Sequence, residues 1–321
     1  MTTLKSVPAA RAPLAFDPDL VRKYDQSGPR YTSYPTADRF HEAFGPADYV
    51  QALITRRETR PHDPLSLYVH VPFCNTLCFY CACNKVITKD HGRSAKYIRY
   101  VAREVDIVSS ILESDAPVAQ LHLGGGTPTF LARDEMSSLI GHLRGAFPFA
   151  PDAEVSIEVD PRKVDASTIA FLGSLGFNRI SVGVQDFDPA VQKAVNRVQS
   201  EEETRTVIEA ARASGFVSVN TDLIYGLPKQ TVAGFSSTLD RVIALSPDRI
   251  ALYGYAHVPH LFKPQRRIQL DDLPPPADKL AILALAIEKL GAAGYVYIGM
   301  DHFAKPADEL ARAQSQRKLH R

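Results

Sequence analysis

From residue 65 to residue 300 the chain alternates short apolar runs, rich in β-branched residues, with amphipathic stretches of helical period. Strands that alternate with helices in this way indicate βα units and a parallel sheet. Seven runs are predicted strands: LSLYVHV from 65, QLHLGGG from 120, EVSIEVDP from 154, RISVGVQ from 179, SVNTDLIYGLP from 218, RIALYGY from 249 and YVYIGM from 295. The chain is therefore expected to be an α/β protein whose sheet either closes into a (β/α) barrel or stays open as a partial barrel.

The segments between the strands supply the helices. Apolar periodicity predicts helices over residues 97–112, 200–215 and 277–294, and the last two end on a glycine at a C-cap position. In an open or a closed barrel, the loops after the carboxyl ends of the strands form the functional site. The motifs described below follow the first four predicted strands, so we expect them to meet at one edge of the sheet.

The two ends of the chain differ from the alternating region. Residues 1–64 are rich in proline and arginine, and GPRYTSYPTADRF at 28–40 has no regular period, so we predict an irregular arm packed on a barrel of residues 65–305. Residues 306–321 include DELARAQSQRKLHR, an amphipathic helical pattern that stops without a capping signal. We expect residues 306–321 to be the start of a truncated helical region.

The charge balance bears on possible partners. The chain has 37 Lys and Arg residues against 36 Asp and Glu residues, so no net field attracts nucleic acid or an anionic membrane. The N-terminal MTTLKSVPAARAPLAF lacks an uninterrupted apolar core, and no later segment offers about 18–20 apolar residues free of charge. We therefore expect a cytoplasmic protein that binds neither nucleic acid nor membrane.

All four cysteines fall within one loop, VPFCNTLCFYCACNK, as Cys74, Cys78, Cys81 and Cys83. Thiols packed so closely in an extended loop cannot easily adopt disulfide geometry, so a metal-binding loop is the better interpretation. The spacing CxxxCxxC can supply three thiolates to a cubane iron–sulfur cluster and leave the fourth iron open. Two alternatives remain: a zinc site, which lacks a second ligand pair, and a closed cluster with Cys83 as fourth ligand.

Polar and glycine residues gather after the next strands. Gly124, Gly125 and Gly126 let the backbone approach a ligand closely, although glycines at a strand end are usually only a turn. Glu158 and Asp160 alternate with apolar residues on a strand, where buried carboxylates need donors such as ligand hydroxyls. The alternative is a salt bridge with one of two arginines. These two arginines are Arg162 and Arg179. Further candidates near strand ends are Gln185, Arg197, Asp222, Tyr253, Tyr255 and His257.

The segment CNTLCFYC resembles the signature of the radical S-adenosylmethionine (SAM) superfamily, with Tyr80 before the third cysteine. The resemblance implies a partial (β/α) barrel and a [4Fe–4S] cluster held by Cys74, Cys78 and Cys81. It also implies that SAM binds the open iron and is cleaved by one electron to a 5′-deoxyadenosyl radical. Tyr80 can offer a stackable face to adenine.

A closer resemblance, to the oxygen-independent coproporphyrinogen III oxidases, covers almost the whole chain. It rests on GPRYTSYPTA, CNTLCFYCACNK, HLGGGTPT, EVDPR, SVGVQDF and IGMDHFAKP. Cys83 and the RYTSYPTA arm favour this family over the similar haem chaperones. The implied reaction converts two propionates of coproporphyrinogen III to vinyl groups, with loss of carbon dioxide, in haem synthesis.

The resemblance also implies roles for individual residues. One SAM would contact Tyr68, Gly125 and Glu158. A second SAM would contact Tyr80, Gly126, Thr127, Gln185, Arg197, Asp222 and Ala256. Cys83 and Arg30 are the candidate catalytic residues, Cys83 as a non-ligand thiol. Arg30, together with Arg39 and Arg162, is a candidate partner of the substrate carboxylates, because Arg binds carboxylates in bidentate fashion.

The expected partners are coproporphyrinogen III and an unidentified one-electron donor, with the chain acting as a monomer. The alternatives are a haem chaperone of the same superfamily and a non-enzymatic iron–sulfur electron carrier or zinc scaffold. Family members carry a further C-terminal helical region over the active site. We therefore expect cluster assembly and SAM cleavage to survive in this chain, and propionate decarboxylation to be impaired.

Overall fold

The computed structural model describes residues 16–24, 36, 39–113 and 115–319, and its central feature is one eight-stranded sheet. In the order in which they lie in the sheet, the strands are β1 (Leu65–Val71), β4 (Val118–Gly125), β5 (Phe149–Val159), β6 (Arg179–Gln185), β7 (Ser218–Tyr225), β8 (Arg249–Gly254), β10 (His302–Ala304) and β9 (Val296–Gly299). The strands from β1 to β8 pair in parallel. The predicted α/β class is confirmed, and within the described residues β1 and β9 are unpaired edges, so the barrel is partial.

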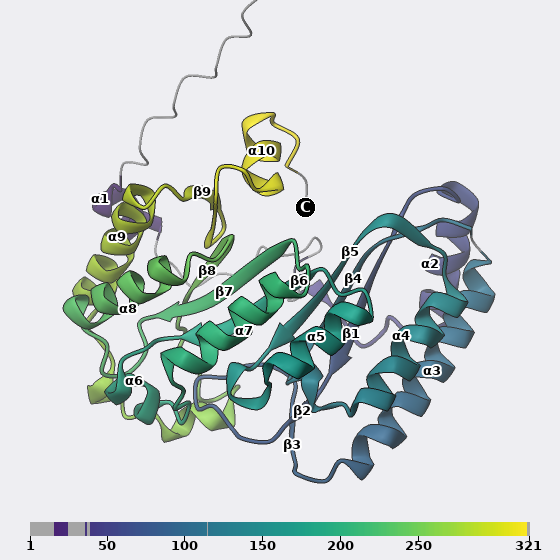
Figure 1. Cartoon of the computed structure of the whole chain (residues 1–321), viewed down its shortest axis with the longest axis horizontal. Coiled ribbons are helices and arrows are strands. Elements are labelled where there is room, and N and C mark those ends of the chain that lie inside the picture. The colour runs from purple at the N-terminus through teal and green to yellow at the C-terminus, as the bar shows by residue number, and fades with distance from the viewer. Residues whose placement is uncertain (1–15, 25–35, 37–38, 114, 320–321) are drawn as a thin grey trace, which may run out of the picture.

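Helices follow the strands and cover one side of the curved sheet (Figure 1). They are α3 (Gly92–Leu112), α4 (Arg133–Ala146), α5 (Ala166–Ser174), α6 (Pro189–Ala194), α7 (Glu201–Ala213), α8 (Val232–Leu245) and α9 (Pro276–Ala292). The three predicted helices are confirmed as α3, α7 and α9. The predicted glycine ends are also confirmed, because Gly215 (φ +81°) and Gly294 (φ +87°) adopt the left-handed conformation just beyond α7 and α9. Among the described residues, no helix is both long enough and apolar enough to cross a bilayer.

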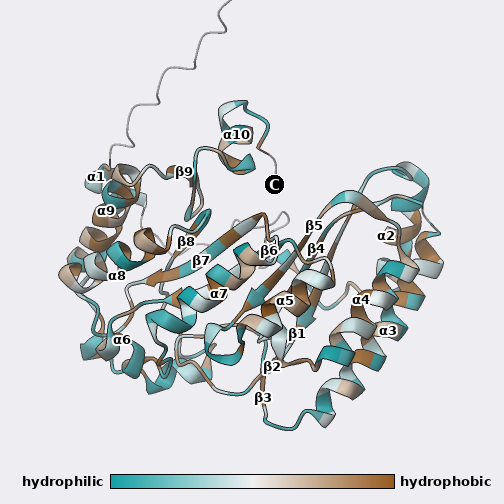
Figure 2. Ribbon diagram, in the orientation of Figure 1, coloured by the Kyte–Doolittle hydropathy of each residue, from teal (hydrophilic) through white to brown (hydrophobic). Residues whose placement is uncertain are grey.

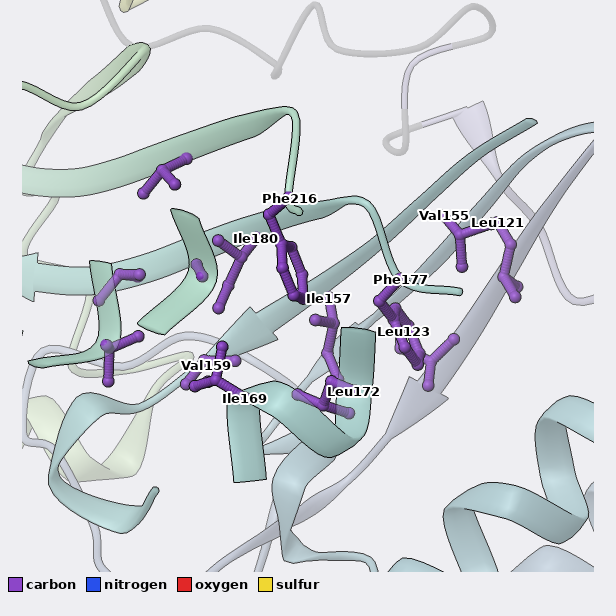
Figure 3. Close-up of a cluster of buried hydrophobic side chains, with 14 of the residues drawn as sticks. Leu121, Leu123, Val155, Ile157, Val159, Ile169, Leu172, Phe177, Ile180 and Phe216 are labelled. Atoms are coloured by element: carbon purple, nitrogen blue, oxygen red, sulfur yellow. The ribbon is translucent and has the colours of Figure 1, made fainter. Parts of the chain in front are cut away.

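The core lies between the sheet and these helices. Each strand turns its apolar residues toward the helices, as Ile157 and Val159 of β5 do toward Ile169 and Leu172 of α5 (Figure 3). Figure 2 shows the same segregation along the ribbon, where apolar stretches line the strands and the inner faces of the helices. Full burial of one such side chain contributes about 1.5–3 kcal/mol. The intervening strand residues are polar and face the opposite, concave side of the sheet.

The N-terminal arm is only partly irregular, because it contains α1 (Pro18–Tyr24) and α2 (Pro46–Thr59). Arg57 in the last turn of α2 donates to the carbonyl of Ile111 and to the carboxylate of Glu113, each at 3.0 Å. Leu53 of the same helix packs against the main core. The arm is therefore fastened to the end of α3, whereas most of the GPRYTSYPTADRF motif, including Arg30, lies outside the described residues.

The seventh predicted strand is confirmed as β9, but it does not join the parallel set directly. The short strand β10, which the sequence does not reveal, pairs antiparallel with both β8 and β9. Met300 (φ +49°) and Asp301 (φ +68°) form the tight turn between the two strands. Two consecutive left-handed residues are typical of a two-residue hairpin turn.

The final helix, α10 (Glu309–Ser315), has a cap at each end, which corrects the expectation that it stops uncapped. The Asp308 side chain accepts from the Leu310 amide at its start. At its end Arg317 is left-handed (φ +57°), and the Lys318 amide donates to the Ala313 carbonyl at 2.8 Å. This is the Schellman arrangement. The sequence hides it because an arginine occupies the position where glycine is expected.

Short elements complete the architecture. The strands β2 (Phe73–Cys74) and β3 (Val86–Ile87) pair in parallel and form a small second sheet around the cysteine loop. Short 3₁₀ helices lie in loops of the described part of the chain, among them η2 (Pro128–Phe130), η3 (Pro161–Lys163), η4 (Lys263–Arg267) and η5 (Leu270–Asp272). The elements η2 and η3 follow β4 and β5 directly, so they help to shape the edge of the sheet where the motifs meet.

Candidate functional site

The cysteine loop, residues 72–88, is tied at both ends by β2 and β3. The Val86 amide donates to the Pro72 carbonyl at 2.7 Å, and the Thr88 amide donates to the Cys74 carbonyl at 3.0 Å. Lys85 donates from Nζ to the Cys81 carbonyl inside the loop, at 3.0 Å. These hydrogen bonds satisfy backbone groups at both ends of the loop.

The middle of the loop is held by residues far away in the sequence. The Phe79 amide donates to the Val195 carbonyl at 2.9 Å, and Asn196 Nδ2 donates to the Leu77 carbonyl at 2.7 Å. Gln265, which is buried, donates from Nε2 to the Tyr80 carbonyl at 3.1 Å. The sequence analysis missed Asn196 and Gln265, because only the fold brings their amides to the loop.

The four cysteines are free thiols, and Cys74, Cys78, Cys81 and Cys83 all line one pocket at the carboxyl edge of the sheet. The described residues contain no group of three or more His, Cys, Asp or Glu side chains placed to hold a single metal ion. A cubane cluster has another requirement, because each thiolate binds a different iron.

The surroundings of the thiols fit metal-ligating thiolates. Thr127 donates from Oγ1 to Cys74 Sγ at 3.5 Å, while Arg197 Nη1 and Arg162 Nη2 lie 3.7 and 3.8 Å from Cys78 Sγ. Donors and cations next to sulfur stabilise the charged ligand form and tune the metal that it binds. The donor set therefore fits an iron–sulfur cluster held by three thiolates.

The side chain of Cys83 makes it different from the other three. Its hydrogen bond to Cys81 is the main cause that lowers the pKa of Cys81 to about 6, against the opposing effect of burial. The same hydrogen bond and burial raise the pKa of Cys83. This pairing favours the charged form of Cys81 over that of Cys83. The non-ligand role of Cys83 stays a prediction.

Packing within the chain requires glycine at the end of β4. A Cβ on Gly125, whose φ is +115°, would lie 2.7 Å from the ring of His70. A Cβ on Gly126 would lie 2.8 Å from backbone atoms of Pro72 and Phe73. The end of β4 therefore packs directly on the start of the cysteine loop, and the pocket is lined by glycine backbone on this side.

Glu158 lies on the concave face and belongs to a polar row across three strands. It accepts from the Gly125 amide at 3.1 Å and lies 3.4 Å from Nε2 of His122. His122 is hydrogen-bonded through Nδ1 to Ser156 Oγ at 2.8 Å, and its ring stacks on Tyr68 with centroids 5.8 Å apart. His122 was missed, although its polar character at an alternating position of QLHLGGG could have indicated it.

Asp160 forms a salt bridge, which is one of the two roles that the sequence allowed for this carboxylate. Arg162 Nη2 lies 2.6 Å from Asp160 Oδ2, and Arg197 Nη2 lies 3.5 Å from Oδ1. Burial would raise the pKa of Asp160, but the hydrogen bond and charge of Arg162 and the charge of Arg197 lower it. Arg162 is consequently committed to the cluster pocket, rather than presented as a free cation for a substrate carboxylate. Arg179 instead pairs with Glu154 at 2.9 Å.

Gln185 and Asp222 line the same pocket as the cysteines. Gln185 ends β6 in the left-handed region (φ +65°), a conformation that is uncommon outside glycine and is often found at functional sites. Asp222 accepts from Ser181 Oγ and Asn220 Nδ2, each at 2.8 Å. Burial is the main cause that raises the pKa of Asp222 to about 6, helped by the nearby charge of Glu158.

The remaining predicted residues lie at the margin of the pocket. Tyr80 lines it, whereas the Ala256 carbonyl accepts from the Gln265 amide group that also holds the Tyr80 carbonyl. Tyr255 is buried and bonds His257 through its hydroxyl, so it belongs to the core. Tyr253 is exposed at the other end of the concave face. Gly126, Thr127 and Arg197 line the pocket.

Comparison with known proteins agrees with this geometry. Residues 68–242 match the model of the radical SAM superfamily. An oxygen-independent coproporphyrinogen III oxidase of Pseudomonas aeruginosa is 57% identical over 310 residues, which cover 96% of this chain and 67% of that protein. The corresponding Escherichia coli protein is 49% identical, covering 95% of this chain and 66% of its own length.

A solved structure extends the comparison. Coproporphyrinogen III oxidase from Escherichia coli, described as a radical SAM enzyme, superposes with a TM-score of 0.90 at 47% identity. The match covers 97% of this chain and 69% of the solved chain. The chain thus spans about two thirds of the length of the relatives that it matches.

Gly126→Ala tests the packing of β4 on the cysteine loop. The new methyl group would meet the Pro72–Phe73 backbone at 2.8 Å, so we expect the free energy of unfolding to fall by about 1–3 kcal/mol. Gly141→Ala in α4 is the matched control, since its Cβ has no neighbour within 4 Å and helix propensity should stabilise it by about 0.5–1 kcal/mol. Urea unfolding measures both; equal effects of the two substitutions would contradict the packing argument.

Asp222→Asn tests the perturbed carboxyl. Because the pKa of Asp222 is about 6 in the folded chain, above the ordinary value of 3.8 for this carboxyl, the folded state binds the proton more tightly than the unfolded state. Its stability contribution is therefore lost as the pH rises from about 4 to about 6, by at most about 3 kcal/mol. We expect Asp222→Asn to be more stable relative to wild type at pH about 7.5 than at pH about 4.5. Urea unfolding measures the free energy of unfolding of both proteins. The same difference between variant and wild type at the two pH values would refute this prediction.

Proposed function

The chain belongs to the radical SAM superfamily and, within it, to the family of oxygen-independent coproporphyrinogen III oxidases, and from this premise we propose that it decarboxylates two propionate side chains of coproporphyrinogen III. The product would be protoporphyrinogen IX, which carries two vinyl groups in their place. Family membership implies a [4Fe–4S] cluster and SAM. The observation that carries the proposal is the pocket in which the four thiols of the cysteine loop meet Gly125, Glu158 and Asp222.

The cluster would be held by Cys74, Cys78 and Cys81. With SAM bound at its open iron, such a cluster supplies a 5′-deoxyadenosyl radical, which can remove hydrogen from an unactivated carbon. Arg162 and Arg197 stabilise the thiolate of Cys78 by their positive charge. These two arginines therefore favour the charged form of this ligand.

The other lining residues would bind and orient SAM. Glu158 and Asp222 offer carboxylates to its hydroxyl and amino groups, while the pocket-lining backbone of Gly125 and Gly126 permits close approach. We propose two SAM molecules, one against Tyr68, Gly125 and Glu158. The second would lie against Tyr80, Gly126, Thr127, Gln185, Arg197, Asp222 and Ala256. The support is that one continuous pocket includes most of both sets.

The substrate would lie on the open, concave side of the sheet. Loss of a hydrogen atom from the β-carbon of a propionate, followed by loss of carbon dioxide and one electron, leaves a vinyl group. We propose that Cys83 assists as a non-ligand thiol and that Arg30 of the arm pairs with a propionate carboxylate. Residues 65–305 would form the catalytic barrel and residues 1–64 the arm. The chain would act as a cytoplasmic monomer supplied by a one-electron donor.

The experiment that tests this function combines anaerobically reconstituted protein, dithionite, SAM and coproporphyrinogen III. We expect 5′-deoxyadenosine to form, and protoporphyrinogen IX to form with it in lower yield than the Pseudomonas aeruginosa relative gives, in line with the impaired decarboxylation expected from the sequence; mass spectrometry quantifies both products. The Pseudomonas aeruginosa relative serves as positive control. Formation of 5′-deoxyadenosine alone would support the radical centre and contradict the decarboxylation. Tight haem binding with neither product would favour a chaperone.

Cys81→Ala and Cys83→Ala separate the ligand from the non-ligand thiol. Removal of Cys81 deletes a cluster ligand, so we expect the iron content and the cluster absorbance to be lost after reconstitution. Cys83→Ala should retain about four irons per chain, because three thiolates suffice. Iron analysis and electron paramagnetic resonance measure the outcome, and circular dichroism checks folding. Loss of the cluster in Cys83→Ala would indicate a closed site with four thiolates instead.

A further inference from the structure

The cysteine loop has an outer side as well as the side that lines the pocket. On the outer side Phe79 packs against Val191 and Val195 of the α6 region and against Ile268, which follows η4. The guanidinium of Arg267 lies over the Phe79 ring, 5.2 Å from its centroid. Phe79 directly follows Cys78 in the chain, so this packed region adjoins a proposed cluster ligand in sequence.

A groove runs over this packed region, between α6 and the segment after β8, which lie together at the lower part of Figure 1. Its lining residues come from α6, from the loop after β7 and from the η4–η5 segment: Ala190, Lys193, Ala194, Pro228, Lys229, Arg267, Ile268, Gln269 and Asp272. The groove is distinct from the pocket of the thiols, since the two share no lining residue.

Exposed basic and apolar side chains lie on the two segments that line the groove, and Lys193 and Arg267 are lining residues. Lys193, Lys263 and Arg267 are exposed, and among the described residues no carboxylate forms an ion pair with any of these three. Leu261 and Leu270, each 67% exposed, lie on the same segment. We call these five residues the basic face. Exposed apolar side chains surrounded by charge are typical of protein docking surfaces.

Carboxylates on the same elements do not neutralise the basic face. Asp188 caps α6, where it accepts from the Ala190 amide at 2.8 Å. Asp272 pairs with Lys229 at 3.2 Å, and Asp271 beside it is exposed. Two of the three carboxylates are thus already engaged. The whole chain carries a formal charge of only +1, so the cations of this face are a local concentration.

We propose that the basic face is the docking site for an acidic one-electron carrier protein, which reduces the cluster from the outer side of the loop. This inference rests on the proposed function, because only a redox cluster needs such a partner. One electron passes from the carrier to the cluster, the carrier is oxidised by one electron, and no bond or proton is transferred. Delivery from the outer side leaves the pocket free for SAM and substrate.

The expected interaction is transient and electrostatic. Redox encounters use small interfaces, and complementary charge raises their association rate more than their affinity. Added salt screens such charges. The rate of reduction by an acidic carrier should therefore depend on the charges of the basic face and on ionic strength, whereas a small reductant should be indifferent to both.

The test uses the double variant Lys193→Glu/Lys263→Glu, neither residue of which lines the thiol pocket. The control, Lys96→Glu/Arg103→Glu, makes the same change of charge on exposed positions of α3. A reduced plant-type [2Fe–2S] ferredoxin is the acidic carrier and dithionite the small reductant. Stopped-flow absorbance follows reduction of the reconstituted cluster at about 50 mM and about 300 mM salt.

We expect the basic-face variant to be reduced by ferredoxin about tenfold more slowly than wild type at low salt, with the difference shrinking at high salt. Reduction by dithionite should be unchanged, and the α3 control should stay within about twofold of wild type for both reductants. An unchanged ferredoxin rate in the basic-face variant, or an equal fall in the α3 control, would overturn the docking site.

A second measurement separates docking from the proposed function. Calorimetric titration of oxidised ferredoxin into the protein does not require electron transfer, and its binding should weaken in the basic-face variant alone. If dithionite fails to reduce any cluster in wild type, the proposed function fails and the docking inference falls with it. If dithionite reduces the cluster but the variant binds and accepts electrons normally, only the docking inference fails.

Discussion

The site depends on the hydrogen bonds that hold the cysteine loop against the rest of the fold. The loop backbone accepts from Asn196 and Gln265, and the Phe79 amide donates to the Val195 carbonyl. These partners follow β6 and β8 in the chain, so the position of the loop depends on the assembled sheet. The four thiols of the loop line one pocket. Hydrogen bonds to the fold restrict the conformations that the loop can adopt.

Charge compensation around Cys78 is the second requirement. Burying several thiolates and carboxylates together is unfavourable unless cations and donors are buried with them. Asp160 orients Arg162, and both arginines that approach Cys78 also contact this carboxylate. Among the described residues no arginine forms an ion pair with Asp222, and burial is the main cause that raises its pKa. The pocket thus contains one carboxylate held firmly ionised and one that protonates easily, because only the first has arginines beside it.

The sequence reveals what is local and periodic. The strand pattern places β1 and β4 to β8, and the spacing of the cysteines identifies the loop, because both signals lie within short windows. It cannot reveal the contact of Gln265 with Tyr80, which are 185 residues apart. Nothing in the sequence around Gln265 distinguishes it from a glutamine on the surface. Likewise, the ending of α10 at Arg317 depends on a backbone conformation that the residue type disfavours. The sequence also could not decide whether Asp160 forms a salt bridge or contacts a ligand. That choice depends on which arginines the fold brings beside it.

The two sides of the cysteine loop have different requirements, and the same few hydrogen bonds serve both sides. The inner side must keep SAM and a radical away from water, while the outer side must stay accessible to a source of electrons. A loop anchored through its own side chains would expose or cover both sides together. Here the Leu77 and Tyr80 carbonyls are held by amide side chains from outside, so Phe79 is wedged under Arg267 while the thiols face inward. Asn196 and Gln265 therefore determine both the orientation of the thiols and the position of the outer surface. A substitution of either residue is expected to alter both.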